Sequence, residues 1–269
     1  MGEYRCFKSF WGMTGPLEEQ FKAVKDAGYD GFDGSLPDPS LDQRLIGLLQ
    51  EYHFPYVPTV KTQGPDHFAS FQREIDRALT FSPPLINSHT GRDTLSQKER
   101  SELFTKILKY EEQLPVPVSH ETHRSRVTFS PMAALELVNE FPTLRLNADF
   151  SHWCCVCESL LEDQADTMAR IIKNVIYIHG RVGYPQGPQA PDPAAPEYAR
   201  ELAAHEAWWK AIAVNLKAQN KMIGFCPEYG PGFSRYMHTL PYTDQSVADL
   251  WKVCLWAAKR FKKNVIDTI

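Results

Sequence analysis

The segments LNADFSHW at residues 146–153 and VIYIHGRVG at residues 175–183 decide the fold. Each begins with a short apolar run typical of a buried strand and then reaches ionisable side chains. Similar runs recur along the chain, and longer stretches with apolar residues at helical spacing separate them. This alternation predicts βαβ units and a parallel sheet. The candidate strands are Arg5–Trp11, Gly31–Ser35, Tyr56–Lys61, Leu85–His89, Val116–Glu121, Leu144–Phe150, Val175–His179 and Met222–Glu228.

These candidate strands match the number that closes an α/β barrel, and the chain length of 269 residues suits one such barrel. The stretches between them carry single apolar stripes, which outer helices need. Examples are Leu17, Phe21 and Val24, and later Val247, Leu250, Trp251, Cys254, Ala258 and Phe261. No shift in composition marks a second domain. We therefore expect an α/β fold, a single (β/α)8 TIM barrel over residues 1–269.

The composition limits the functional classes. Hydrophobic residues make up 43% and charged residues 23%, which is typical of a globular chain and excludes disorder. The net charge is -4 and the basic residues are scattered, which disfavours nucleic acid as a partner. No leader-like or membrane-spanning stretch is recognisable, so we expect a cytoplasmic protein without a membrane partner.

The cysteines are interpreted as thiols, because nothing places them in an oxidising compartment. The cluster CCVC at 154–157 has no second Cys or His pair at a zinc-finger spacing, so we do not assign it a metal. The six are Cys6, Cys154, Cys155, Cys157, Cys226 and Cys254.

Ionisable residues close the last four predicted strands. The segments read VPVSHETHR, LNADFSHW, VIYIHGRVG and GFCPEYGPG. In a barrel of this kind the carboxyl ends of the strands build the active site. Three carboxylates meeting there would repel one another unless a cation lay between them. With one imidazole and no thiolate the set suits Mn²⁺ or Mg²⁺, with Co²⁺ and Zn²⁺ as further options. The expected ligands are Glu121, Asp149, His179 and Glu228.

These motifs resemble the xylose isomerase-like barrel superfamily, which includes sugar isomerases and epimerases, dehydratases and endonuclease IV. The resemblance covers nearly the whole chain and rests on the Glu of HETHR, on DFSHW, on HGR and on the Glu of PEYG. It implies that the four expected ligands bind one divalent metal. It also implies that His152 and Arg181 hold substrate oxygens, and that Glu121 and Glu228 exchange protons with the substrate.

Such a site predicts chemistry next to a carbonyl group. A metal that chelates a carbonyl and a neighbouring hydroxyl acidifies the adjacent C–H and stabilises the enediolate. Two glutamates on opposite sides of the substrate would allow epimerisation, and returning the proton to the adjacent carbon would give isomerisation. Loss of a β-hydroxyl from a cyclic hydroxy-ketone, of the inosose or 3-dehydroshikimate type, is the alternative. We expect a metal-dependent isomerase or epimerase of a small sugar or polyhydroxy carbonyl compound.

Other side chains near the predicted mouth have open roles. His89 and Lys61 end the fourth and third strands, and either could face the substrate. Trp11 and Trp153 could form an apolar wall against a sugar ring, or they could belong to the core. Arg124 and Arg126 follow HETHR and would suit an acidic substrate, or they could pair with surface carboxylates.

Two other functions are disfavoured. An AP endonuclease would need a histidine at the end of the third strand and an Asp-x-His element after the seventh, and neither is present at Lys61 or Asp192. A barrel that binds without catalysis would show an occluded mouth. The loop at 184–198 either covers part of the mouth or only connects elements. The last helix, with Trp251 and Trp256, leaves a homo-oligomer open.

Overall fold

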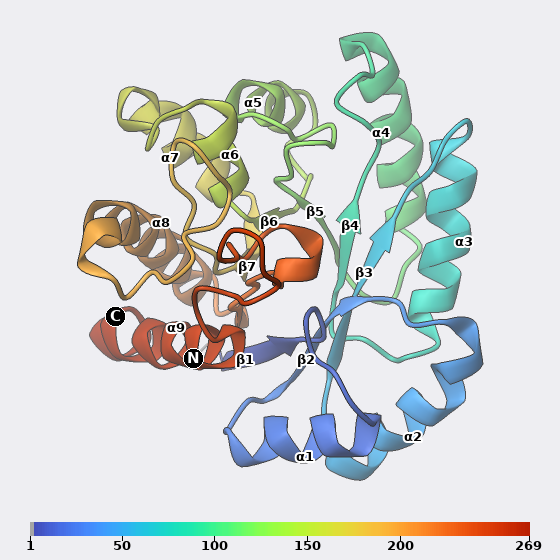
Figure 1. Cartoon of the computed structure of the whole chain (residues 1–269). Coiled ribbons are helices and arrows are strands. Elements are labelled where there is room, and N and C mark those ends of the chain that lie inside the picture. Colours follow the sequence, from blue (N-terminus) through green and yellow to red (C-terminus); the bar gives the residue numbers. More distant parts are fainter. Residues whose placement is uncertain (1–2) are drawn as a thin grey trace.

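Residues 3–269, described by a computed structural model, form a closed barrel of parallel strands that follow one another in sequence order (Figure 1). Pairing of Tyr4 with Ile223 joins the first strand to the last and closes the sheet. The expected (β/α)8 barrel is confirmed. The strands are β1 Tyr4–Ser9, β2 Gly31–Ser35, β3 Tyr56–Lys61, β4 Ile86–His89, β5 Val118–Glu121, β6 Leu146–Ala148, β7 Val175–His179 and β8 Ile223–Cys226.

Helices surround the strands on the outside of the barrel (Figure 1). Several begin where the sequence supplies a cap: Asp66 accepts from two backbone N–H groups of α3, and Ser96 and Glu99 form a capping box on α4. The helices are α1 Leu17–Asp26, α2 Asp42–Tyr52, α3 His67–Leu79, α4 Gln97–Glu111, α5 Pro131–Glu140, α6 Ser151–Val156, α7 Ala165–Ile172, α8 Ala199–Ala218 and α9 Leu250–Asn264.

Three strands have the predicted bounds, and the others are shorter than predicted. The strand expected over Leu144–Phe150 is reduced to β6, because the backbone N–H of Asp149 bonds to the side chain of Thr122 at 2.8 Å instead of to a strand. The strand expected over Met222–Glu228 ends at Cys226. Pro227 follows it and has no N–H to continue the ladder. Both truncations fall at the mouth, where the chain turns to present side chains.

The core lies between the barrel and the helices, as the predicted apolar stripes require. Phe21 and Val24 of α1 are fully buried, and Phe261 of α9 stacks on Phe225 of β8 at 3.8 Å between ring centroids. Val247 is an exception, since it precedes α9 and is 47% exposed. The six cysteines are free thiols, as expected. Within residues 3–269, no helix has both the length and the apolar character needed to cross a membrane.

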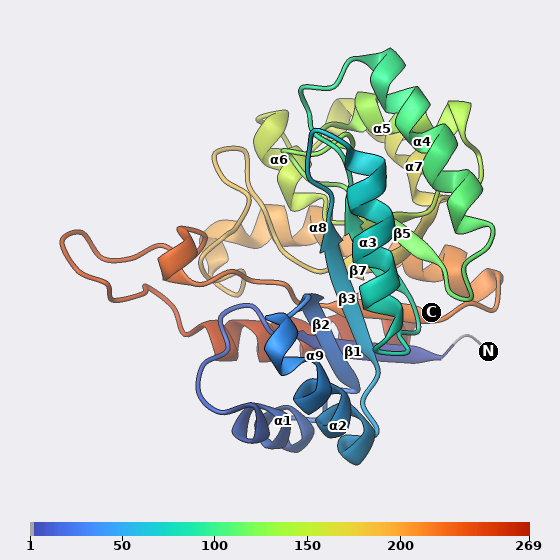
Figure 2. The ribbon, with the colours of Figure 1, turned by 90° about the vertical axis from the view of Figure 1, so that its right-hand side faces the viewer.

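Two loops at the carboxyl ends of the strands are long. In Figure 2 the two termini lie on the right, and the segment between β8 and α9 projects to the left, away from the body of the barrel. This segment, 227–249, includes a short bridge between Thr239 and Ser246. The second loop, 184–198, follows β7 and is braced by a bridge between Tyr184 and Gly187.

Candidate metal centre

The ends of β5 to β8 bring the four expected ligands together. Glu121 and His179 are the last residues of β5 and β7, whereas Asp149 and Glu228 follow β6 and β8 directly or nearly so. One ligand atom from each of the four lies within 4.8 Å of the corresponding atom of every other. The structure therefore contains the carboxylate and imidazole cluster that the strand ends predict.

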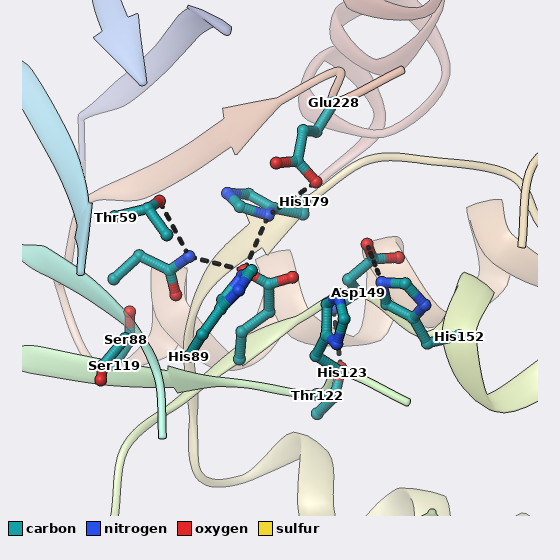
Figure 3. A network of polar contacts seen from close by, with 12 residues as sticks. Thr59, Ser88, His89, Ser119, Thr122, His123, Asp149, His152, His179 and Glu228 are labelled. Carbon is teal, nitrogen blue, oxygen red and sulfur yellow. Dashed lines mark hydrogen bonds and ion pairs between the residues drawn. The ribbon is translucent and has the colours of Figure 1, made fainter. Parts of the chain in front are cut away.

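His179 lies at the centre of this cluster (Figure 3). Its Nδ1 is 3.3 Å from Oε2 of Glu121 and 3.2 Å from Oε2 of Glu228, but neither contact has hydrogen-bond geometry. Burial lowers the pKa of His179, yet the carboxylates of Glu228 and Asp33 raise it well above its usual value. A cation is thus favoured at this point. The residues fit a divalent metal, because buried oxygens and an imidazole nitrogen without a hydrogen-bond partner in residues 3–269 converge on it.

Asp33 supports the imidazole from the opposite side, and the sequence analysis missed it. Its Oδ2 is 3.3 Å from Nε2 of His179 and accepts from the hydroxyl of Tyr177 at 3.1 Å. The side chain is fully buried on β2, and burial raises its pKa. A carboxylate on the distal nitrogen orients an imidazole so that the other nitrogen faces a metal. A charged residue inside the apolar run GFDGS was the available signal.

Asp149 is held by Arg181 and Ser151. Arg181 Nη2 donates to Oδ2 of Asp149, and its Nε donates to Ser151 Oγ at 3.0 Å, while that hydroxyl donates to Asp149. Burial raises the pKa of Asp149, and the guanidinium of Arg181 opposes this rise. Arg181 Nη2 also donates to Nε2 of His152 at 2.9 Å. Arg181 faces the cavity, as expected for a substrate contact, whereas His152 is fully buried and contacts Arg181 and Asp149.

Glu121 is fixed by two donors from β4. Asn87 Nδ2 donates to its Oε2 at 2.6 Å, and His89 Nε2 lies 2.8 Å from the same oxygen. Burial would raise the pKa of Glu121, but His89 and His179 bring it well below the usual value. His89 also lines the cavity, so it lies near the expected substrate position and at the same time contacts Glu121, an expected metal ligand. Asn87 was not identified from the sequence.

His123 is a further imidazole that the sequence analysis did not single out. It forms a second candidate ligand group with His89 and Glu121, and its ring centroid lies 4.0 Å from that of His152. Burial lowers its pKa to about 2, so the ring is neutral at physiological pH. Its place two residues after Glu121 in HETHR was the only sequence signal.

A cavity of about 450 Å³ opens over the cluster, a size suited to a small metabolite. Glu121 and Glu228 lie at its wall, and Trp11 and Tyr236 provide apolar surface. The guanidinium of Arg181 lies 4.8 Å from the Tyr236 ring centroid. Trp153, for which both a wall and a core position were open, is fully buried and donates to the Thr128 carbonyl at 2.8 Å, so it belongs to the core.

The loop at 184–198 contributes no side chain to this cavity. Its buried Gln189 donates to the carbonyl of Gly230 at 3.1 Å and accepts from the Gly230 N–H at 2.7 Å. The loop therefore braces the segment after β8 that carries Tyr236. Its effect on the mouth is indirect, since the 227–249 segment provides the covering residue.

Comparisons with known proteins identify the fold and no more. A scan against protein-family models finds no match, and no curated protein is similar to the chain in sequence. Among solved structures, the probable 3-DHS dehydratase AsbF from Bacillus anthracis has a TM-score of 0.58 and 14% identity, covering 97% of this chain and 99% of its own. A D-tagatose 3-epimerase-like protein has a TM-score of 0.59 and 13% identity, covering 98% and 97%.

An AP endonuclease of family 2 from Brucella melitensis is also similar, with a TM-score of 0.57, 13% identity and coverage of 86% and 95%. The resemblance to the xylose isomerase-like barrels is thus confirmed for the fold. Because one such neighbour is an endonuclease, the fold does not exclude nucleic acid, and its expected absence as a partner stays a prediction.

Proposed function

We propose that the protein is a divalent-metal-dependent isomerase or epimerase of a small polyhydroxy carbonyl compound. The observation that carries this proposal is the cluster of Glu121, Asp149, His179 and Glu228, whose ligand atoms lie within 4.8 Å of one another beside the cavity. The cavity volume of about 450 Å³ suits a sugar-sized molecule. The three neighbours named above share the fold, which favours but does not determine this chemistry.

These four side chains would hold the metal, and their oxygen-rich set favours Mn²⁺ or Mg²⁺ over Co²⁺ or Zn²⁺. When bound, such an ion polarises a substrate carbonyl and stabilises negative charge on its oxygen. The protein contributes by orienting the ligands. Asp33 directs the His179 ring, and Asn87 and His89 fix the Glu121 carboxylate.

Glu121 and Glu228 would carry the proton transfers. They come from β5 and β8, both line the cavity, and both have pKa values below normal despite burial, since His179 lies between them. Ionised carboxylates are suited to act as bases. One removes the proton next to the carbonyl. The other returns a proton to the opposite face in epimerisation, or either returns it to the neighbouring carbon in isomerisation.

Arg181 would position the substrate through the nitrogen that remains free. Its Nη2 is committed to Asp149 and His152, whereas Nη1 makes no hydrogen bond within residues 3–269 and lies 3.8 Å from Glu228 Oε2. A donor at this point can bind the substrate oxygen next to the reacting carbon. Trp11 and Tyr236 would exclude water from that side.

The test is metal analysis of the purified protein and of Glu228→Gln, followed by deuterium uptake from D₂O into a panel of ketoses and cyclic hydroxy-ketones. We expect about one metal per chain, and uptake that falls by about 10²- to 10⁴-fold in the variant, the range for loss of a general acid or base. A wild-type protein that binds no divalent metal would contradict the proposal.

Dehydration of a cyclic hydroxy-ketone is the second candidate, and His123 is the observation in its favour. This neutral imidazole lines the cavity beside Glu121, and its ring N–H can donate a hydrogen bond to a departing hydroxyl, which epimerisation by two glutamates does not need. Dehydration begins with the same proton abstraction. A product lighter than the substrate by one water, formed by wild type and lost in His123→Asn, would identify the lyase reaction.

A further inference from the structure

Arg126 is a cavity residue that forms no ion pair within residues 3–269. It lies on the loop between β5 and α5, and its Nη1 donates to the carbonyl of Thr62 at 3.3 Å and to that of Gly91 at 3.1 Å. These carbonyls belong to the loops after β3 and β4. The guanidinium is therefore anchored by neutral acceptors at the wall of the cavity, with no carboxylate within ion-pair distance among residues 3–269.

The surroundings of Arg126 make this charge costly. Its Nε is buried and has no hydrogen-bond partner in the described chain. Burial lowers the pKa of Arg126 and the nearby Arg92 lowers it further, while the carboxylates of Glu121 and Asp93 oppose this fall only in part. A half-buried cation with unused donors is stabilised by any oxyanion that reaches it. Arg181, the other arginine of the cavity, differs because Asp149 already neutralises it.

Lys61 adds a second unpaired cation on the same side of the mouth. It is the last residue of β3, it is exposed, and it lines the cavity. Within residues 3–269 its amine makes no ion pair. Thr62, whose carbonyl accepts from Arg126, is the next residue along the chain, so the Arg126 guanidinium lies beside the end of β3 that carries Lys61.

We propose that Arg126 and Lys61 form a receptor for an oxyanion, and that the substrate is a polyhydroxy carbonyl compound carrying a carboxylate or phosphate at the end away from the reacting carbon. This proposal rests on the proposed function of the metal centre. The receptor lies at the β3 to β5 side of the cavity, whereas Glu228 and Arg181 come from β7 and β8 and the segments after them. One molecule bound in this cavity would contact both.

The experiment measures binding of D-fructose, D-fructuronate and D-fructose 6-phosphate by calorimetry. These ketoses share a head group and differ at C6, which is neutral, a carboxylate or a phosphate. We expect wild type to bind one of the anions about 10- to 100-fold more tightly than D-fructose, as charge-assisted hydrogen bonds provide. The preferred anion tells which of the two groups the receptor accepts.

Arg126→Gln should remove that preference, and Arg126→Lys, which keeps the charge, should retain part of it. Lys61→Gln should reduce the preference by several-fold; its exposed side chain makes misfolding of this variant a small risk. Arg92→Gln is the matched control. It removes a charge near Arg126 from a side chain that is 52% exposed and lies outside the cavity lining, so it should leave the preference intact.

The proposal is overturned if D-fructose binds as tightly as both anions, if neither anion binds at millimolar concentration, or if the preference survives in Arg126→Gln and Lys61→Gln alike. Metal content and deuterium uptake are measured in parallel on every variant. A wild-type protein without bound metal and without deuterium uptake would contradict the proposed metal centre. The anion preference is measured by binding alone, so the two proposals can fail separately.

Discussion

The two halves of the barrel mouth differ in chemistry. Strands β5 to β8 end in the expected metal ligands, and almost every buried charge at the mouth belongs to this half. Strands β1 to β4 line the same cavity with glycine and hydroxyl side chains, one lysine and one histidine: Ser9, Gly34, Ser35, Thr59, Lys61 and His89. The difference indicates a division of labour. The half from β5 to β8, the ligand half, would activate the substrate and would also bind its oxyanion through Arg126 of the loop after β5. The half from β1 to β4, the recognition half, would shape the cavity and contribute Lys61.

Asp33 links the two halves. It comes from β2, yet it contacts His179 on β7 across the barrel interior, 146 positions away in sequence. Its partner Tyr177 lies on β7 as well. One carboxylate of the recognition half thus supports a side chain of the ligand half.

The largest effect is expected for Glu121→Gln in the ligand half. Deuterium uptake should fall by about 10³-fold or more, because the change removes a negatively charged ligand and a base together. Ser35→Ala, on the cavity wall of the other half, is the control and should change uptake by less than about threefold. The rates are measured by mass spectrometry in D₂O. An equal loss of deuterium uptake in the two variants would contradict the division between the halves.

Asp33→Asn should weaken metal binding by about 10- to 100-fold, the usual effect of losing the carboxylate behind a histidine ligand. The amide keeps the shape but no longer stabilises the His179 ring by charge. The control is Asp30→Asn, which alters a carboxylate that accepts from Cys6 N–H outside the cavity. Metal affinity is measured by competition with a chelator. Unchanged affinity in Asp33→Asn would confine metal binding to the ligand half alone.

Lowering the pH should reduce the free energy of unfolding, because His205, which supports the ligand half, is buried as a neutral ring. This histidine on α8 is fully buried, and its Nε2 accepts from the N–H of Gly183, just after Arg181. Burial lowers its pKa to about 4, below the value of about 6.5 in the unfolded chain. The unfolded state therefore binds the proton first, so this contribution is complete above pH 6.5 and is lost as the pH falls towards 4.

Between pH 7 and pH 5 His205 should cost about 2 kcal/mol of unfolding free energy. His205→Gln keeps an acceptor for Gly183 and should make the stability less dependent on pH by that amount. Urea unfolding at the two pH values measures the difference. If the variant lost as much stability as wild type over this range, the buried histidine would not be the cause.

The smallest effect is expected for Thr59→Val on β3. Thr59 lines the cavity and accepts from Asn87 Nδ2 at 3.2 Å. Its hydroxyl therefore contacts a residue that supports Glu121, and not an expected metal ligand itself. The KM for the substrate should rise by about threefold or less, and kcat should stay the same, as for loss of one neutral hydrogen bond. Steady-state kinetics distinguish the two parameters. A large fall in kcat would place Thr59 in the chemistry and contradict the division.

Much of this organisation could be predicted from local patterns. The bounds of β2, β3 and β7 follow from their apolar runs, and the ligand cluster follows from ionisable residues at consecutive strand ends. The ends of β6 and β8 were predicted too far, because side-chain bonds and Pro227 decide where pairing stops. The positions of His89 and Arg181 at the cavity agree with the sequence analysis, whereas their roles stay predictions.

The supporting residues were missed for a common reason. Asp33 and Asn87 act through contacts with residues on other strands, so nothing next to them in sequence indicates a partner. By sequence Trp153 could be a wall of the mouth or part of the core, and the turn of α6 directs its ring into the core. Arg126 was recognised as a cation, whereas its lack of a carboxylate partner depends on the surrounding loops.

The sequence by itself determined the barrel and the kinds of side chain at its mouth, because hydrophobic periodicity and strand order are local properties that a closed parallel sheet converts directly into position. Only the tertiary structure decided which charges neutralise one another: Asp149 pairs with Arg181 and His179 with Asp33, whereas Arg126 forms no ion pair among residues 3–269. The reason is physical. Electrostatic pairing depends on distance and burial, and both arise when strands distant in sequence meet across the barrel.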